Sequence, residues 1–82
     1  MGLVPVRTLS PWGLHLTREV GDLHCVAVRI EDGWFLGVYR ERGGDEVAFA
    51  RLPVTCSETV AWTVVGMLAG AVVLGAPGEV PL

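Results

Sequence analysis

Hydrophobic and polar positions alternate along residues 13–54, and turn-forming pairs interrupt the alternation at nearly regular spacing. A period of two is the pattern of half-buried β-strands, and pairs rich in Gly and Asp favour tight hairpins between them. These pairs are Gly21-Asp22, Asp32-Gly33 and Gly43-Gly44. The pattern therefore predicts an antiparallel meander with strands near residues 13–20, 23–31, 34–41 and 46–54.

The segment before residue 13 adds a short edge strand to this prediction. Val4 to Leu9 fits an extended stretch, and Pro11-Trp12-Gly13 fits a corner that leads into the next strand. Arginine recurs every 11 residues along the whole meander, which we attribute to a repeated strand and two-residue turn. The positions are Arg7, Arg18, Arg29, Arg40 and Arg51.

From residue 55 the pattern changes to that of a helix. Thr55 and Glu58 have the spacing of a capping box, with Thr55 as the expected N-cap. Residues 59–76 carry no charge, and Gly75, Pro77 and Gly78 follow as a stop signal. We predict a helix over about 57–75 that starts within two residues of Ser57. The chain then forms one α+β domain over residues 1–82, with four to five strands and this helix packed on one face of the sheet.

The uncharged run leaves a second interpretation open. Its 18 residues would span about 27 Å as a helix, barely a bilayer, and Gly66-x-x-x-Gly70 is a spacing found in packed membrane helices. The charges that flank the run are Glu58 and Glu79, and no basic residue adjoins it. A buried core helix is therefore the favoured interpretation, and a tail anchor in a membrane is the alternative.

Two-residue hairpins would assign each side chain to one face of the sheet. They place Val20 opposite Leu23, Glu31 opposite Trp34, and Arg42 opposite Asp45. Small residues in the middle of one face leave room for the helix, so we expect the helix to pack there. That face holds His24, Val26, Val28, Ile30, Phe35, Gly37, Tyr39, Ala48, Ala50 and Leu52.

The opposite face is more apolar than ordinary solvent-exposed surface, so we predict that it binds a partner. In this register Leu16, Ala27, Val38 and Phe49 form an apolar row across four strands, with arginines on both sides. Arginine suits such a rim because its guanidinium makes paired hydrogen bonds to carboxylate or phosphate. The expected partner-binding residues are Arg18, Arg29, Arg40, Arg51, Leu16, Trp34, Val38 and Phe49.

No residue pattern points to catalysis, a metal or a cofactor, so we expect none. Cys56 precedes the predicted helix, where a thiol can be activated, but neither histidine is placed to act as its base. His24 and Cys25 are adjacent on a strand and point to opposite faces, so they cannot share a metal ion. Glu19 and His24 pair across the first hairpin, either as an acid–base couple or as an ordinary surface ion pair.

The amino-acid composition limits the classes of function that the chain can have. The 82 residues are 51% hydrophobic with a net charge of −3, which excludes a disordered tail and argues against a nucleic-acid binder. Two cysteines make no disulfide framework, so we expect unpaired thiols and a reducing, cytoplasmic compartment.

The sequence favours a small non-enzymatic protein-binding module that associates with itself or docks on a larger protein to inhibit, regulate or assemble it. By analogy, small acidic domains without motifs are common among virus-encoded inhibitors and accessory subunits. Two other hypotheses stay open besides the tail anchor. One is a binder of an anionic metabolite or nucleotide at the arginines. The weaker one is an RNA-binding sheet, with Phe49 and Trp34 stacking on bases.

Overall fold

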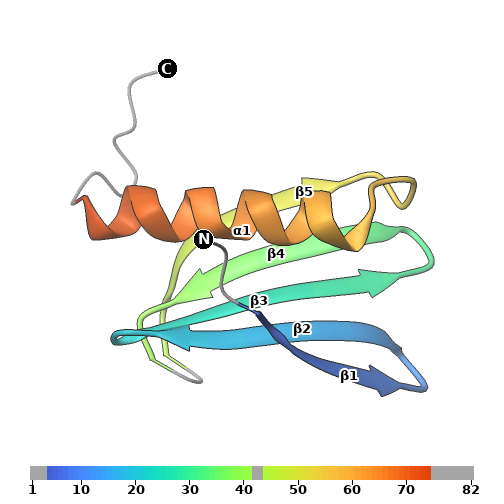
Figure 1. Cartoon of the computed structure of the whole chain (residues 1–82), viewed down its shortest axis with the longest axis horizontal. Coiled ribbons are helices and arrows are strands. Elements are labelled where there is room, and N and C mark those ends of the chain that lie inside the picture. Colours follow the sequence, from blue (N-terminus) through green and yellow to red (C-terminus); the bar gives the residue numbers. More distant parts are fainter. Residues whose placement is uncertain (1–3, 42–43, 75–82) are drawn as a thin grey trace.

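A computed structural model describes residues 4–41 and 44–74 and shows a five-stranded antiparallel sheet with one helix on it (Figure 1). The strands lie side by side in chain order, so the sheet is a simple meander. The predicted α+β architecture is confirmed. The elements are β1 (Val6–Ser10), β2 (Gly13–Val20), β3 (Leu23–Ile30), β4 (Gly33–Tyr39), β5 (Glu46–Leu52) and α1 (Glu58–Val73).

The first three hairpins have two-residue turns, which the sequence pattern predicts for the second and third and which the corner expected at residues 11–13 also forms. Val20 pairs with Leu23 across the Gly21-Asp22 turn, which confirms the expected register of β2 and β3. The turn between β3 and β4 lies one residue earlier than predicted, because Ile30 pairs with Gly33 instead of Glu31 with Trp34. Gly33 belongs to the strand, where its φ of +136° and a carbonyl oxygen of Leu52 leave no room for a Cβ. This shift moves each pairing by two positions and leaves the faces unchanged.

The hairpin between β4 and β5 differs from the prediction by one residue, and the difference exchanges the faces of β5. Val38 pairs with Ala48 and not with Phe49, which pairs with Gly37. The backbone N–H of Arg40 donates to the carbonyl of Asp45 at 3.0 Å, so the connection is longer than a two-residue turn. An irregularity between Val38 and Tyr39 shifts the register further. The predicted pairing of residue 42 with residue 45 lies outside the described residues.

The helix packs on the face that was expected to stay open, so the predicted packing face is wrong. Ala61, Val65, Ala69 and Val72 of α1 are buried, and α1 contacts β3, β4 and β5. Because of the shifted register, Ala48 and Ala50 do pack against this core as expected, whereas Gly37 lies on the far face. The sheet contributes most of the buried side chains of the core, namely Leu14, Leu16, Leu23, Cys25, Ala27, Trp34, Leu36 and Val38.

The helix starts inside the predicted window but has a different cap. Ser57 is the N-cap, and its hydroxyl accepts the backbone N–H of Val60 at 3.2 Å. Thr55 lies in the preceding turn, so the expected capping box does not form. At the other end, the N–H of Leu74 donates to the carbonyl of Gly70 at 3.0 Å. The loop before α1 is held by the Trp34 indole, which donates to the carbonyl of Cys56 at 2.8 Å.

Candidate functional site

Three of the predicted partner-binding residues lie in the core. Leu16, Trp34 and Val38 are at most 1% exposed, because α1 packs on their face of the sheet. Phe49 is 53% exposed, but it lies on the opposite face of the sheet together with Arg51. The predicted apolar row therefore does not form a surface of the folded chain.

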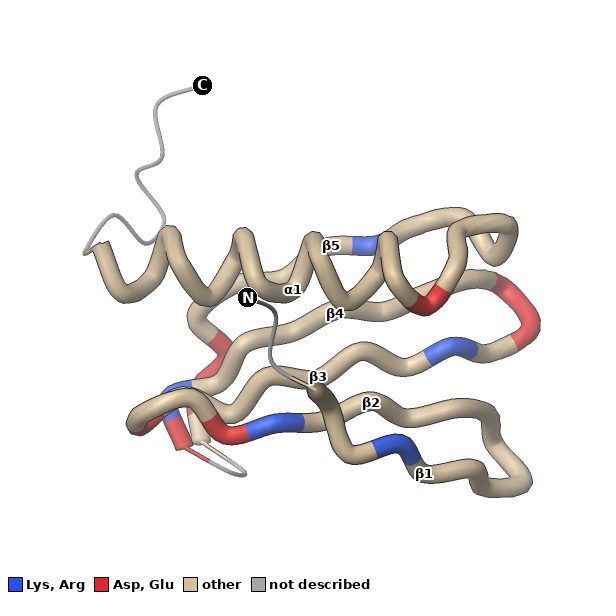
Figure 2. The backbone as a smooth tube through the Cα atoms, in the orientation of Figure 1, with Lys and Arg blue, Asp and Glu red and all other residues tan. Residues whose placement is uncertain are grey.

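The four predicted arginines do not gather into one rim. Arg18 donates to the carbonyl of Val4 at 3.1 Å, and Arg40 lies 3.8 Å from a carboxylate oxygen of Asp22. The Arg51 guanidinium lies 4.5 Å from the centre of the Phe35 ring on the open face of the sheet. Figure 2 shows the basic positions scattered over the sheet. The prediction of a common arginine-flanked site is wrong in its geometry.

Near the start of α1, Arg7 and Glu58 form an ion pair, and Arg29 adds a positive charge to their surroundings. Arg7 of the edge strand donates two hydrogen bonds to Glu58, at 3.0 and 3.2 Å. These bonds, with the positive charges of Arg7 and Arg29, hold the pKa of Glu58 below its usual value. A carboxylate in the first turn of a helix is also favoured by the helix dipole. The ion pair ties β1 to α1.

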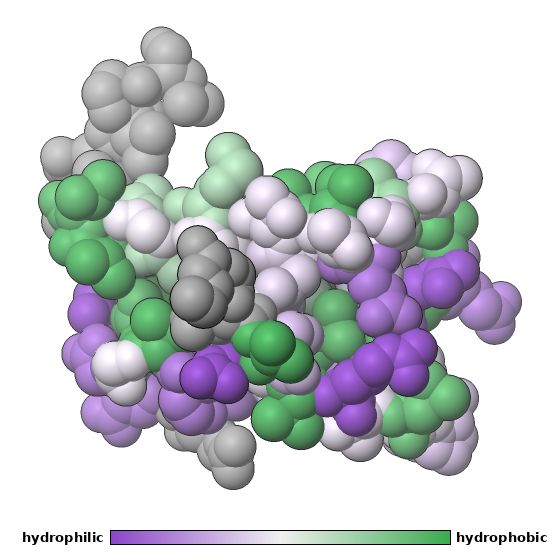
Figure 3. Space-filling model, viewed as in Figure 1, coloured by the Kyte–Doolittle hydropathy of each residue, from purple (hydrophilic) through white to green (hydrophobic). Residues whose placement is uncertain are grey.

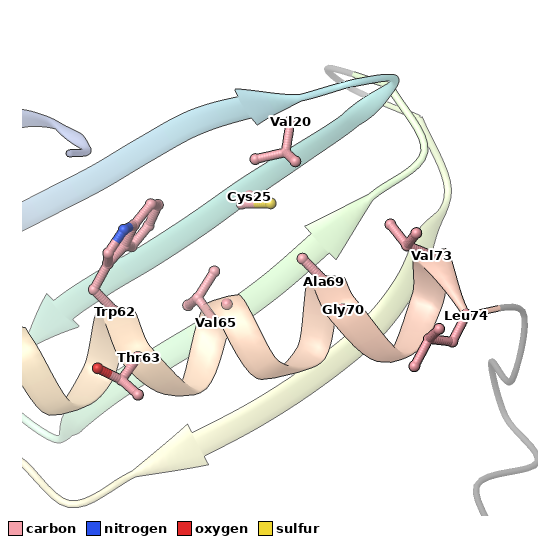
Figure 4. A pocket seen from close by; sticks show the side chains of 10 residues that line it. Val20, Cys25, Trp62, Thr63, Val65, Ala69, Gly70, Val73 and Leu74 are labelled. Atoms are coloured by element: carbon pink, nitrogen blue, oxygen red, sulfur yellow. The ribbon is translucent and has the colours of Figure 1, made fainter. Parts of the chain in front are cut away.

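A hollow lies between α1 and the β2–β3 hairpin (Figure 4). Its volume is about 700 Å³, within the range of ligand and peptide sites in proteins. Trp62 stands at one end, and Val73 and Leu74 stand at the other. We call it the α1 groove, and it is lined by Val20, Cys25, Trp62, Thr63, Val65, Gly66, Ala69, Gly70, Val73 and Leu74.

The groove exists because one helix is narrower than the sheet. Five strands at about 4.8 Å spacing span roughly 20 Å, whereas a helix with its side chains is about 10 Å wide. α1 lies over β3, β4 and β5, so the flank toward β2 is left open. Small residues widen the opening, since no atom lies within 4 Å of where a Cβ on Gly66 or Gly70 would be.

The groove wall continues into an apolar outer surface of α1. Val60 is 48% exposed, Met67 68%, Val73 69% and Leu74 84%. After Glu58 the helix carries no charge, and Figure 2 shows it tan beyond its first turn. In the space-filling view the surface along α1 is white to green, and purple residues gather below it over the sheet (Figure 3). Exposed apolar surface of this extent is typical of a binding site.

The groove offers little polar chemistry. Burial, and secondarily the charge of Glu19, raise the pKa of the Cys25 thiol, so it stays protonated and weakly nucleophilic. The hydroxyl of Thr63 donates to the carbonyl of Thr59 at 2.8 Å, a bond within the helix. Among the residues that the structure describes, no charged side chain lines the groove. This lining suits an apolar occupant better than an anion.

The other face of the sheet carries the predicted pair of Glu19 and His24. His24 Nδ1 lies 2.6 Å from a Glu19 carboxylate oxygen, which confirms the cross-strand pairing. The Tyr39 ring lies 6.4 Å from that of His24, and its hydroxyl donates to Glu46 at 3.4 Å. These contacts form a chain of polar groups along the surface, and the groove lies on the other side of the sheet.

Three further observations concern metal sites, membrane spans and the thiols. Within residues 4–41 and 44–74 no three His, Cys, Asp or Glu side chains gather as a metal site would require. In the same part of the chain no helix has the length and apolar content needed to cross a membrane. Both thiols are free, with Cys25 buried and Cys56 half-buried.

Sequence reasoning missed the groove as a site. It singled out Gly66 and Gly70, but as a mark of membrane packing, and it placed Val20 and Cys25 on a face that it took to be open. The useful signal was the combination of an uncharged helix with two glycines one turn apart. No protein-family model matches the chain, and no curated protein or solved structure matches it either.

Proposed function

We propose that this protein is a non-enzymatic docking module that binds an apolar helix of a protein partner in the α1 groove. The observation that carries the proposal is the joined surface of the groove and the outer side of α1, which is apolar and uncharged along four turns of helix. Docking of this kind would assemble or regulate the partner. It matches a recurring mode of recognition, in which the apolar face of a helix lies in a hydrophobic groove.

Gly66 and Gly70 favour a helix as the occupant. Both lie on the groove side of α1, one turn apart, with open space above them. Small residues at such spacing let a second helix approach until backbones are nearly in contact. A glycine inside a helix costs roughly 0.5–1 kcal/mol relative to alanine, so each reduces the stability of α1. Close contact with a partner helix is a reason for α1 to carry this cost.

An anionic small molecule fits the structure less well. The sequence left such a ligand open as an alternative because it placed four arginines on one face, and in the structure these arginines lie apart. The groove has a suitable volume, but no described residue of its lining carries a positive charge that would pair with a carboxylate or phosphate. We therefore propose the helix-docking function alone.

Titration with a designed helical peptide tests the proposal. The probe carries leucine and alanine on one face and paired glutamate and lysine on the other, and amide NMR shifts of the full-length protein are the readout. We expect shifts at Gly66, Gly70 and Cys25 and at the indole N–H of Trp62. A control peptide of the same composition, with its apolar residues scattered around the helix, should leave these signals in place.

Filling the groove provides the matched protein control. Gly66→Leu places a side chain in open space, so the fold should persist while peptide binding falls at least about tenfold. The proposal is wrong if the apolar peptide leaves the groove signals unchanged. It is also wrong if the two peptides act alike.

A further inference from the structure

We infer that the helix received by the α1 groove is α1 of a second copy of this chain, so that the protein forms a two-fold dimer. This inference rests on the docking function proposed above and names its partner. The described part of each chain has an opening beside one helix, and the same helix has an apolar outer side that needs covering. The α1 groove and the helix that would occupy the groove of another copy therefore belong to the same surface.

The charge distribution favours a like partner at this surface. The chain carries a net charge of −3, so two copies repel one another at most orientations. The outer side of α1 is different because no ionisable residue follows Glu58 along the helix, and Glu58 itself is paired with Arg7. Within the described residues, two copies that meet through this side bring no unpaired carboxylates together.

The glycines indicate how the two helices would meet. In a closed dimer the same patch faces itself, so each contact occurs twice. A two-fold axis midway between Gly66 and Gly70 places Gly66 of one copy against Gly70 of the other. The helices then run antiparallel, an arrangement in which their dipoles attract. It also brings Leu74, which is 84% exposed, toward Trp62 at the far end of the other copy's groove.

Area sets the expected strength of the dimer. A 16-residue helix is about 24 Å long and about 10 Å wide, so one helix alone presents roughly 240 Å² in projection. A standard interface buries about 800 Å² of accessible surface on each partner. The contact reaches that class only if the groove walls take part, so we expect a reversible dimer with a micromolar dissociation constant.

Analytical ultracentrifugation of the full-length protein over a concentration series is the test. The wild type should move from monomer to dimer, and Gly70→Leu should weaken the association by more than about tenfold. Leucine fits the open space above Gly70 and is a better helix former, so the monomer should melt no lower than the wild type. Val6→Leu is the control, since Val6 is also an exposed valine but lies on the edge strand β1, away from α1 and the groove.

A mixed sample of isotope-labelled and unlabelled protein locates the contact. Isotope-filtered NMR should show contacts between Gly66 of one copy and Gly70 of the other. A wild type that stays monomeric at all concentrations overturns the inference. So does a dimer that survives Gly70→Leu, or one whose contacts lie at the edges of the sheet.

The two proposals fail in different ways. If the wild type is a monomer and the apolar peptide still shifts the groove signals, the docking function stands and only the second copy is excluded. If the peptide fails with the protein held monomeric by dilution, the groove does not accept a helix and both proposals are wrong.

Discussion

The inner and outer sides of α1 are both uncharged beyond the first turn, yet their environments are opposite. Ala61, Val65, Ala69 and Val72 are at most 7% exposed, whereas Met67 and Leu74 on the outer side are more than half exposed. An ordinary surface helix separates apolar and polar residues onto its two sides. Here the apolar character extends all the way around. Burial of a residue in α1 therefore depends on whether it faces the sheet. The outer side has the uncharged character of a binding interface.

The strongest test of this difference in environment is to place the same charge on each side of α1. Val65→Asp buries a carboxylate at a site that is 1% exposed and should destabilise the fold by more than about 4 kcal/mol. Met67→Asp, two residues away at a site that is 68% exposed, should change stability by less than about 1 kcal/mol. Urea unfolding at low protein concentration measures both. Similar losses in the two variants would show that the outer side of α1 is also part of a core.

The contrast between two hairpins explains how much of the fold the sequence could predict. Gly21-Asp22 is a tight turn between two strands of equal length, so local residues fix the register of β2 and β3. Between β4 and β5 the glycine pair lies in a longer connection, and Arg40 bonds to Asp45 outside it. Whether such a loop holds two residues or more depends on the strand twist and on the irregularity after Val38, which local pattern does not reveal.

This one-residue difference in the register of β4 and β5 determines which residues share a face of the sheet. With β5 in the predicted register, Phe49 and Arg51 join Leu16 and Val38 on one face, and with the observed register they lie on the other. The position of the groove was also beyond prediction. A helix that is apolar all round has no preferred side, so its pattern does not tell which strands it covers. The uncharged run and its two glycines were visible in the sequence, but their meaning required the fold.

Two substitutions between alanine and glycine test the same difference between the two sides of α1, with smaller expected changes in stability. Ala69→Gly removes a buried methyl group and lowers helix propensity, so we expect a loss of about 1.5–2 kcal/mol. Gly66→Ala adds a methyl group in open space and should stabilise the monomer by about 0.5–1 kcal/mol. Thermal unfolding of dilute protein gives both values. Equal signs for the two variants would contradict the assignment of these residues to opposite environments.

The reactivity of the two cysteines distinguishes the groove from the loop before α1. Cys25 is 2% exposed and burial raises its thiol pKa, whereas Cys56 is half-buried at the entry to the helix. We expect iodoacetamide to label Cys56 first and Cys25 only slowly, because the thiolate is the reactive form. Mass spectrometry of the intact protein follows both steps. In urea without reductant both thiols should be labelled, and an unlabelled protein two mass units lighter would reveal a disulfide instead.

The smallest effect concerns the start of α1, where the comparison is between its charged first turn and its uncharged remainder. Glu58→Gln removes the charge that Arg7 binds, so we expect a small loss of stability at neutral pH. Because the pKa of Glu58 is lowered in the folded state, its contribution is complete above the ordinary carboxyl pKa and disappears as pH falls through the lowered value. Melting temperatures of the wild type and Glu58→Gln should therefore differ at pH 7 and converge in acid. High salt should also reduce the difference at pH 7, because both side chains are substantially exposed. The same difference at every pH would mean that the carboxylate acts only as a packing or capping group, and that β1 is held to the helix by other contacts.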